Sequence, residues 1–172
     1  MACWALAGFY LSLMPAVVAT TMHVASPWIG GVVVSTLMLT GAVAVATLRI
    51  WQARRLVVFG TSALVLGVAV SLVGIQQQLV AVLFGGTMIA GVGFGATFSG
   101  TLRSLLPTAH PDQRAGLLST YFVQSYLAFS LPAVAAGLTI PSIGLANVAY
   151  SYGAAVMLLS VTSLLASLRA DR

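Results

Sequence analysis

Hydrophobic residues run through nearly the whole chain and are interrupted only by three short clusters of arginines. The clusters leave three stretches without charge, residues 1–48, 56–102 and 115–168. A single helix needs roughly 20 apolar residues to cross about 30 Å of hydrocarbon. Each stretch is long enough for two such helices and a tight turn, so the pattern predicts an all-α membrane protein.

Turn-forming residues occupy the middle of each stretch. Proline, glycine and asparagine gather at residues 23–27, 74–78 and 140–147, and these residue types interrupt helices. The chain is therefore predicted to be a single bundle of six transmembrane helices. Their expected bounds are residues 2–22, 28–48, 56–74, 79–100, 116–138 and 148–168.

Composition excludes a water-soluble domain. Charged residues make up 5% of the chain and hydrophobic residues 60%, and the mean hydropathy is +1.07. Soluble domains are about 25% charged. The expected surroundings of this chain are therefore a lipid bilayer.

The positions of the arginines predict an orientation, because cytoplasmic loops near span ends carry an excess of basic residues. The arginines follow the second, fourth and sixth predicted helices, while the three opposite turns carry no charge. They are Arg49, Arg54, Arg55, Arg103, Arg114, Arg169 and Arg172. Both termini are thus expected on the cytoplasmic side. The arginine-only basic set is typical of a GC-rich bacterial genome, which indicates the inner membrane.

The net charge of +5 does not indicate a nucleic-acid partner. The arginines are spread over three loops, with no soluble fold around them. Cys3 is the only cysteine, so neither an internal disulfide nor a cysteine-rich metal site is expected, and no cofactor is predicted. The chain starts on an apolar run without a basic leader, so residues 1–22 are interpreted as a retained span of a longer protein.

The fourth predicted span carries small residues on two sides. One side holds Gly91, Gly95 and Ser99, and the other holds Gly86, Ala90, Gly93, Thr97 and Gly100. Small residues let helix backbones approach closely in lipid, so this span is expected to lie between two neighbours. Its run GVGFGA is similar to a phosphate-binding loop, but it lies within an apolar helix, where packing is the favoured interpretation.

The fifth span has the most polar interior. Spacings of three and four place Tyr121, Gln124, Ser125 and Ala128 on one side of a helix. Such a side is expected to face away from lipid. Hydrogen bonds between helices and contact with a solute explain it equally well, and both interpretations stay open.

The first, third and sixth spans differ in character. The first has a small face, Gly8, Ser12, Pro15 and Ala19, and its proline permits a kink. The third and sixth are apolar over most of their middle, so they are expected to face lipid. No Asp, Glu, Lys, Arg or His lies within a predicted span, so no proton carrier is expected inside the bilayer.

An enzyme is not expected. An intramembrane serine protease would need a Gly-x-Ser-Gly nucleophile and a histidine base on another span. The segment 97–100 (TFSG) lacks the first glycine, and His23 and His110 fall in loops.

Two segments resemble a known family. The stretch GVGFGATFSGTLRSLLPTAHPDQRAGLLSTYFVQSYLAFSLPAVAAG is similar to the tenth span, inner loop and eleventh span of bacterial major facilitator superfamily (MFS) transporters. In the loop RIWQARR, Ala53, Arg54 and Arg55 resemble the Gly-Arg-Arg end of the family's repeated loop motif, although the acidic residue and the usual glycines are absent. Over nearly its whole length the chain resembles the C-terminal six-helix half of such a transporter.

The resemblance implies a 3+3 inverted repeat and transport of a small solute by an efflux-like permease. Spans one and four would line the cavity, two and five would face the other half, and three and six would be peripheral. The missing N-terminal half or a second copy would complete the transporter. Uncharged polar residues expected to line the cavity are Tyr10, Ser12, Thr97, Tyr121 and Gln124. The cytoplasmic gating and topology loops would contain Arg49, Arg54, Arg55, Arg103 and Arg114.

Two alternatives stay open. Packing alone explains the glycines and hydroxyls, so a non-transporting membrane scaffold or assembly protein fits the same sequence. A homodimeric half-transporter, joined through spans two and five, fits it as well.

Overall fold

The computed structural model describes residues 1–22 and 28–169 and is helical nearly throughout. The long helices are α1 (Ala2–Ala16), α2 (Trp28–Thr47), α3 (Ala53–Gln76), α4 (Val80–Leu105), α5 (Arg114–Ile143) and α6 (Leu145–Arg169). A π-helix, η1 (Val17–Thr21), continues α1, and short 3₁₀ turns cover Leu48–Ile50, Leu106–Thr108 and Pro111–Gln113. Within the described residues, six helices are long and apolar enough to cross a membrane, which confirms the prediction of six long apolar helices. This all-helical fold is compatible with a multi-pass membrane protein.

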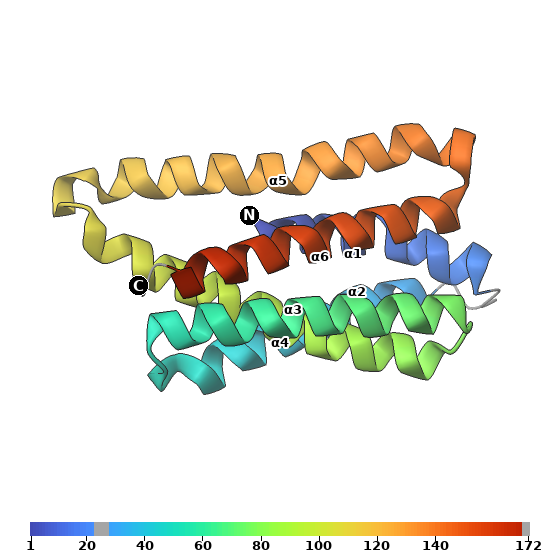
Figure 1. Cartoon of the computed structure of the whole chain (residues 1–172), viewed down its shortest axis with the longest axis horizontal. Helices are drawn as coiled ribbons and strands as arrows, with labels where there is room; N and C mark the ends of the chain where they lie inside the picture. The colour runs from blue at the N-terminus through green and yellow to red at the C-terminus, as the bar shows by residue number, and fades with distance from the viewer. Residues whose placement is uncertain (23–27, 170–172) are drawn as a thin grey trace.

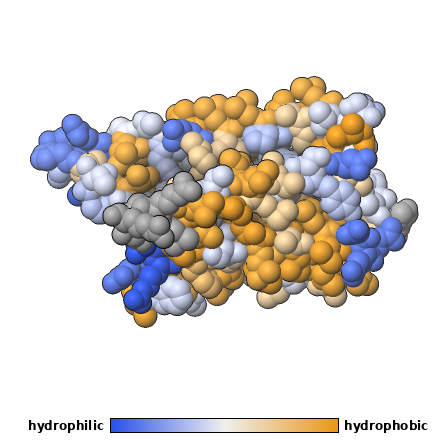
Figure 2. Space-filling model, viewed as in Figure 1, coloured by the Kyte–Doolittle hydropathy of each residue, from blue (hydrophilic) through white to orange (hydrophobic). Residues whose placement is uncertain are grey.

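The arginine-bearing loops lie together at one end of the bundle, the left end in Figure 1. The Arg103 guanidinium donates hydrogen bonds to the backbone carbonyls of Arg49 and Trp51, at 2.5 and 3.5 Å. It thereby ties the last turn of α4 to the loop after α2. Figure 2 shows a largely hydrophobic middle between two more hydrophilic ends, as expected for a bundle that crosses a bilayer.

The turn expected at residues 74–78 lies slightly later in the chain. Helix α3 continues through Gln76, and Gln78 adopts a positive φ of 55°. The Leu79 amide donates to the Gly74 carbonyl at 2.9 Å and closes the turn. Gly74 stays helical because it packs against α4, where a β-carbon on it would lie 2.6 Å from the Leu83 nitrogen. The turn expected at residues 23–27 lies outside the described residues.

The long turn expected at residues 140–147 is wrong. Helix α5 continues through Pro141 to Ile143, and only Gly144, with φ of 80°, separates it from α6. A proline in the last turn of a helix removes one backbone hydrogen bond, and the Gly144 amide still donates to the Ile140 carbonyl at 2.9 Å. With 30 residues, α5 is about 45 Å long, longer than the hydrocarbon core of about 30 Å.

Helix α1 forms the centre of the bundle and packs against α5, α6 and α2. Phe9 and Tyr10 are fully buried. Close approach to α2 occurs at Pro15, where a β-carbon on Gly30 would lie 2.8 Å from the Pro15 Cα. The π-helical turns of η1 begin two residues after Pro15, the proline at which the sequence permits a kink. Pro15 has no amide hydrogen to donate to the helix, and the irregular geometry comes directly after it.

Helix α4 lies between α2 and α3, and each small face meets one neighbour. On the α2 side, a β-carbon on Gly91 would lie 2.5 Å from the Leu37 carbonyl oxygen, and Gly95 packs on the backbone of Gly41. On the α3 side, a β-carbon on Gly86 would lie 2.5 Å from the Ser71 nitrogen. Ser99 is also buried.

Helices α3 and α4 meet through glycines spaced by seven residues on both sides. Gly60, Gly67 and Gly74 of α3 face Thr97, Ala90 and Leu83 of α4, and Gly86, Gly93 and Gly100 of α4 face Ser71, Leu64 and Leu56 of α3. From one contact to the next, the residue number on one helix rises by seven and the number on the other falls by seven. The last contact, at Leu56, departs from this rule by one residue. A spacing of seven keeps one seam in register along a helix pair. We call this contact the α3–α4 seam.

The expectation that the third span faces lipid is right for only one side of α3. Phe59, Leu66 and Val73 expose 40%, 55% and 43% of their surface and form an outward stripe. The neighbouring side, which contains Gly60, Gly67 and Gly74, is the α3–α4 seam. A similar division holds for α6, where Ala149 and Ser160 are fully buried while other positions are exposed.

Helix α5 lies at the edge of the bundle (Figure 1) and packs on α1 and, more loosely, on α6. Only Ser125 and Ala136 of its residues are buried. Large apolar side chains on it are exposed, including Leu131 and Leu138. The sequence did not predict so open a position for the span with the most polar interior.

Candidate functional site: an aromatic cluster that joins three spans

Two of the five predicted cavity residues face protein in this structure. Tyr10 is fully buried, and its hydroxyl lies 2.6 Å from the Ser71 hydroxyl on α3. Thr97 is 6% exposed and packs against Gly60, and its hydroxyl has no hydrogen-bond partner within the described part of the chain. Both side chains point into the interior beside α3. A hydroxyl can be accommodated between closely packed helices as well as in a cavity.

The other three predicted residues are accessible but lie apart. The Ser12 hydroxyl is exposed and donates to the Gly8 carbonyl of its own helix at 2.6 Å. Gln124 lies in a shallow groove between α5 and α6, beside Leu159. Tyr121 is half-buried, and its hydroxyl accepts a hydrogen bond from the Trp4 indole at 3.3 Å. The structure therefore does not bring the five residues into one site.

The buried Tyr10–Ser71 pair provides a test of the interior. Replacing Tyr10 by phenylalanine removes the hydrogen bond and leaves the Ser71 hydroxyl without this partner. We expect a loss of about 0.6–1.7 kcal/mol in the free energy of unfolding, the range for hydrogen bonds between membrane helices. Denaturation in mixed micelles measures it. Ser12→Ala, which removes only a bond within one helix, is the control and should change stability by less.

Tyr121 belongs to an aromatic cluster centred on Trp4. We define the Trp4 cluster as Trp4, Phe94, Phe98, Tyr121, Phe122 and Tyr126. The indole centroid lies 5.9–6.4 Å from the rings of Phe94, Phe98, Phe122 and Tyr126, mostly edge to face. These are the distances and orientations that aromatic rings prefer.

Three helices contribute to the cluster through simple spacings. Trp4 lies in the first turn of α1, Phe94 and Phe98 are one turn apart on α4, and Phe122 and Tyr126 are one turn apart on α5. In the described residues α4 and α5 have almost no backbone contact with each other. The indole of Trp4 therefore bridges two spans whose backbones hardly meet.

The cluster lies in the half of the bundle nearer the arginine-bearing loops, since Phe98 precedes Arg103 by five residues and Tyr121 follows Arg114 by seven. Its members offer ring faces, ring edges and the Tyr121 hydroxyl, and none is an Asp, Glu, Lys, Arg or His. Such surfaces bind flat apolar molecules by stacking and organic cations through the negative ring face.

The sequence reasoning selected uncharged polar residues and therefore missed most of the cluster. A signal was present, because aromatic residues recur four apart in two spans, at Phe94 and Phe98 and at Phe122 and Tyr126. Such spacing places both rings on one side of a helix. That Trp4 meets both pairs depends on how the helices are arranged, which the spacing does not specify.

The chain matches no protein-family model, no curated protein and no solved structure. The resemblance to the major facilitator superfamily therefore stays a prediction from the sequence. Arguments about function rest on the arrangement of the helices and on the Trp4 cluster.

Proposed function

We propose that this chain is one six-helix half of a secondary transporter of the MFS type, which moves a small solute across the inner membrane without changing it chemically. It acts with an N-terminal half or with a second copy of itself, and both termini are cytoplasmic. The observation that carries the proposal is the pairing of the helices. The orientation of the termini follows from the positions of the arginines.

The pairs are related by exchanging the first three helices with the last three. Helix α4 packs on α2 and α3, α1 packs on α5 and α6, and α3 packs on α6. If α1 is exchanged with α4, α2 with α5 and α3 with α6, the contact of α4 with α2 becomes the contact of α1 with α5. In the same way the contact of α4 with α3 becomes that of α1 with α6, and the contact of α3 with α6 is unchanged. Helices α1 and α4 run in opposite directions (Figure 1), as an inverted repeat requires.

The pairing is less regular where α5 is involved. Helix α1 contacts α2 directly, but the equivalent pair, α4 and α5, meets mainly through the Trp4 cluster. In the proposed transporter these rings close the cytoplasmic side of the solute passage. Opening would separate the α4 rings from the α5 rings, and a flat apolar solute would stack between them.

The outward apolar surfaces of α2 and α5 are where the other half would bind. Leu39 and Val43 of α2 and Leu131 and Leu138 of α5 are all exposed. Lipid covers such surfaces equally well, so they are compatible with the half-transporter without requiring it. The proposal therefore needs a direct measurement of transport.

The test combines solute binding with counterflow. The purified chain is screened by thermal unfolding against small solutes with flat apolar parts. A ligand at a hundred times its Kd stabilises a protein by about 2.7 kcal/mol, which corresponds to a rise in Tm of roughly 5–10 °C. Each stabilising solute is then tested for counterflow in vesicles.

We expect counterflow in vesicles that hold two copies of the chain, or the chain together with its other half, above the rate in protein-free vesicles. Stabilising solutes that never show counterflow would favour the scaffold alternative. Counterflow in vesicles that hold a single copy would contradict the half-transporter.

A further inference from the structure

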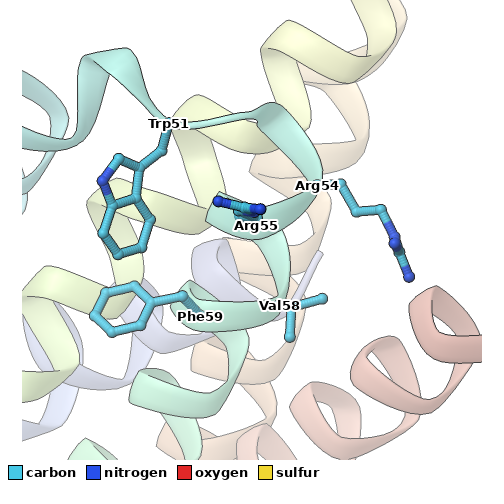
Figure 3. A pocket seen from close by; sticks show the side chains of 5 residues that line it. All are labelled: Trp51, Arg54, Arg55, Val58 and Phe59. Carbon is cyan, nitrogen blue, oxygen red and sulfur yellow. The ribbon is translucent and has the colours of Figure 1, made fainter.

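A groove lies between the second half of α5 and the first half of α6. Its walls include Pro132, Ala135 and Ala136 of α5 and Ser151, Tyr152 and Ala155 of α6. The groove at the arginine-bearing end is different, because its lining residues other than Trp51 lie on one helix, α3, and Arg54 points away from Arg55 (Figure 3). The groove beside α5 instead leaves space between two helices, and its small residues would let them approach more closely.

One residue of this groove, Tyr152, carries a buried hydroxyl that makes no hydrogen bond. Tyr152 is 6% exposed, and among residues 1–22 and 28–169 its hydroxyl has no hydrogen-bond partner. Burying a hydroxyl without a partner is costly, because nothing replaces the hydrogen bonds that the group makes elsewhere. An arrangement of the helices in which this hydroxyl is bonded is therefore favoured over one in which it is not.

An acceptor lies close to the Tyr152 hydroxyl, on α5. A β-carbon on Gly8 of α1 would lie 2.7 Å from the Tyr152 hydroxyl oxygen and 2.5 Å from the Phe129 carbonyl oxygen. Both oxygens therefore approach the same point on α1, where glycine has no side chain to keep them away. A carbonyl oxygen has two lone pairs, so that of Phe129 can accept a hydrogen bond from Tyr152 as well as one within its own helix. A donor and an acceptor thus lie near each other without being bonded.

Helix α5 is held loosely enough to bring these two groups together. Only Ser125 and Ala136 of its residues are buried, and only Gly144 separates it from α6. Pro132 follows Phe129 by three residues and has no amide hydrogen to donate within the helix. Helices bend most readily at such prolines, so α5 is easiest to bend directly beside the acceptor.

We infer that α5 has a second, closed position, populated in the bilayer, in which the Tyr152 hydroxyl donates a hydrogen bond to the Phe129 carbonyl. We call this bond the Tyr152 latch. In the closed position the groove between α5 and α6 is narrower, and the latch holds the middle of α5 against α6. The Trp4 cluster contacts α5 nearer the arginine-bearing loops, so the two contacts hold different parts of one helix. The latch concerns the packing of this chain and holds whether or not the chain is part of a transporter.

Phenylalanine in place of Tyr152 gives opposite results for a bonded and an unbonded hydroxyl. Loss of the latch should accelerate amide hydrogen exchange in α5 beyond Pro132 by about three- to fifteenfold, the range for hydrogen bonds between membrane helices. If the hydroxyl is never bonded, Tyr152→Phe removes only an unsatisfied group, and exchange should stay the same or become slower. That result would overturn the proposal. Tyr150→Phe, two residues earlier on α6 and also partly buried, is the matched control and should leave exchange in α5 as it was.

A second measurement observes the acceptor itself. Phenylalanine precedes serine at two places in the chain, at Phe98 before Ser99 and at Phe129 before Ser130. A chain with ¹³C-carbonyl phenylalanine and ¹⁵N serine therefore gives two carbonyl–amide correlations by NMR in lipid nanodiscs, and Ser99→Ala assigns them. Tyr152→Phe should move the Phe129 carbonyl signal and leave the Phe98 signal in place. A Phe129 signal that does not move, or equal movement of both signals, would contradict the latch, the second because it indicates a general change of packing.

Discussion

Leucine in place of Gly67 is expected to lower the free energy of unfolding by about 3 kcal/mol or more, the upper range for overpacking a tightly filled interior. A β-carbon at this position would lie 2.6 Å from the Ala90 Cα. The obstacle is the backbone of α4, which cannot rotate away as a flexible side chain can. The α3–α4 seam would have to separate along several turns.

The matched control is Gly85→Leu. Gly85 lies on α4 beside the seam residue Gly86, yet a β-carbon there meets nothing within 4 Å. Replacing a helical glycine with a side chain that fits removes backbone freedom from the unfolded chain, so this variant should be as stable as the parent or more stable by up to about 1 kcal/mol. Denaturation in mixed micelles compares the two. Equal destabilisation by both variants would show that position 67 is not a close contact.

Alanine in place of Trp4 is expected to release α5 from the rest of the bundle. Removing a large aromatic side chain from a packed site costs roughly 3–5 kcal/mol, and Trp4 contacts rings on both α4 and α5. Because α5 has few other buried contacts, the loss should fall mainly on α5. Amide hydrogen exchange around Tyr121 should accelerate by at least about a hundredfold, since 1.4 kcal/mol corresponds to tenfold, while exchange in α3 should hardly change.

Two further variants distinguish the cluster from a general effect of tryptophan removal. Trp28→Ala removes a largely exposed side chain at the other end of the bundle and should leave exchange in α5 as it was. Trp4→Phe loses the hydrogen bond to Tyr121 but keeps an aromatic ring, so its effect should be smaller. Acceleration spread evenly over all helices would mean that Trp4 stabilises the whole fold and has no special link to α5. In the proposed transporter, Trp4→Ala should also abolish counterflow.

The six spans could be predicted because their length and apolar character are properties of local sequence. The small faces of the fourth span also indicated its two neighbours, and Gly91 and Gly86 contact α2 and α3 respectively. The α3–α4 seam had an equally local signal, the repeat of Gly60, Gly67 and Gly74, but the surrounding valines and leucines indicated a lipid-facing helix. One helix can carry both, on different sides.

Other features depended on information that the sequence does not display locally. Pro141 was interpreted as a turn residue, but a proline in the last helical turn costs little when Gly144 supplies the reversal. Tyr10 was assigned to a cavity because it is polar, whereas its partner Ser71 lies sixty-one residues away on α3. The Trp4 cluster brings together residues from three helices, and only the packing of those helices decides which rings meet.

The α3–α4 seam has a mechanical consequence. Two helices that touch backbone to backbone, glycine into facing residue along most of their length, cannot slide without lifting each side chain over the next. They should therefore move as one rigid body, and α2 moves with them where Gly91 and Gly95 hold it. The easiest change of shape would then be a displacement of α5, which has only two buried residues, against that body, with Gly144 as the joint. A molecule wedged beneath α5 would block the motion, while one bound on the outer stripe of α3 would travel with it.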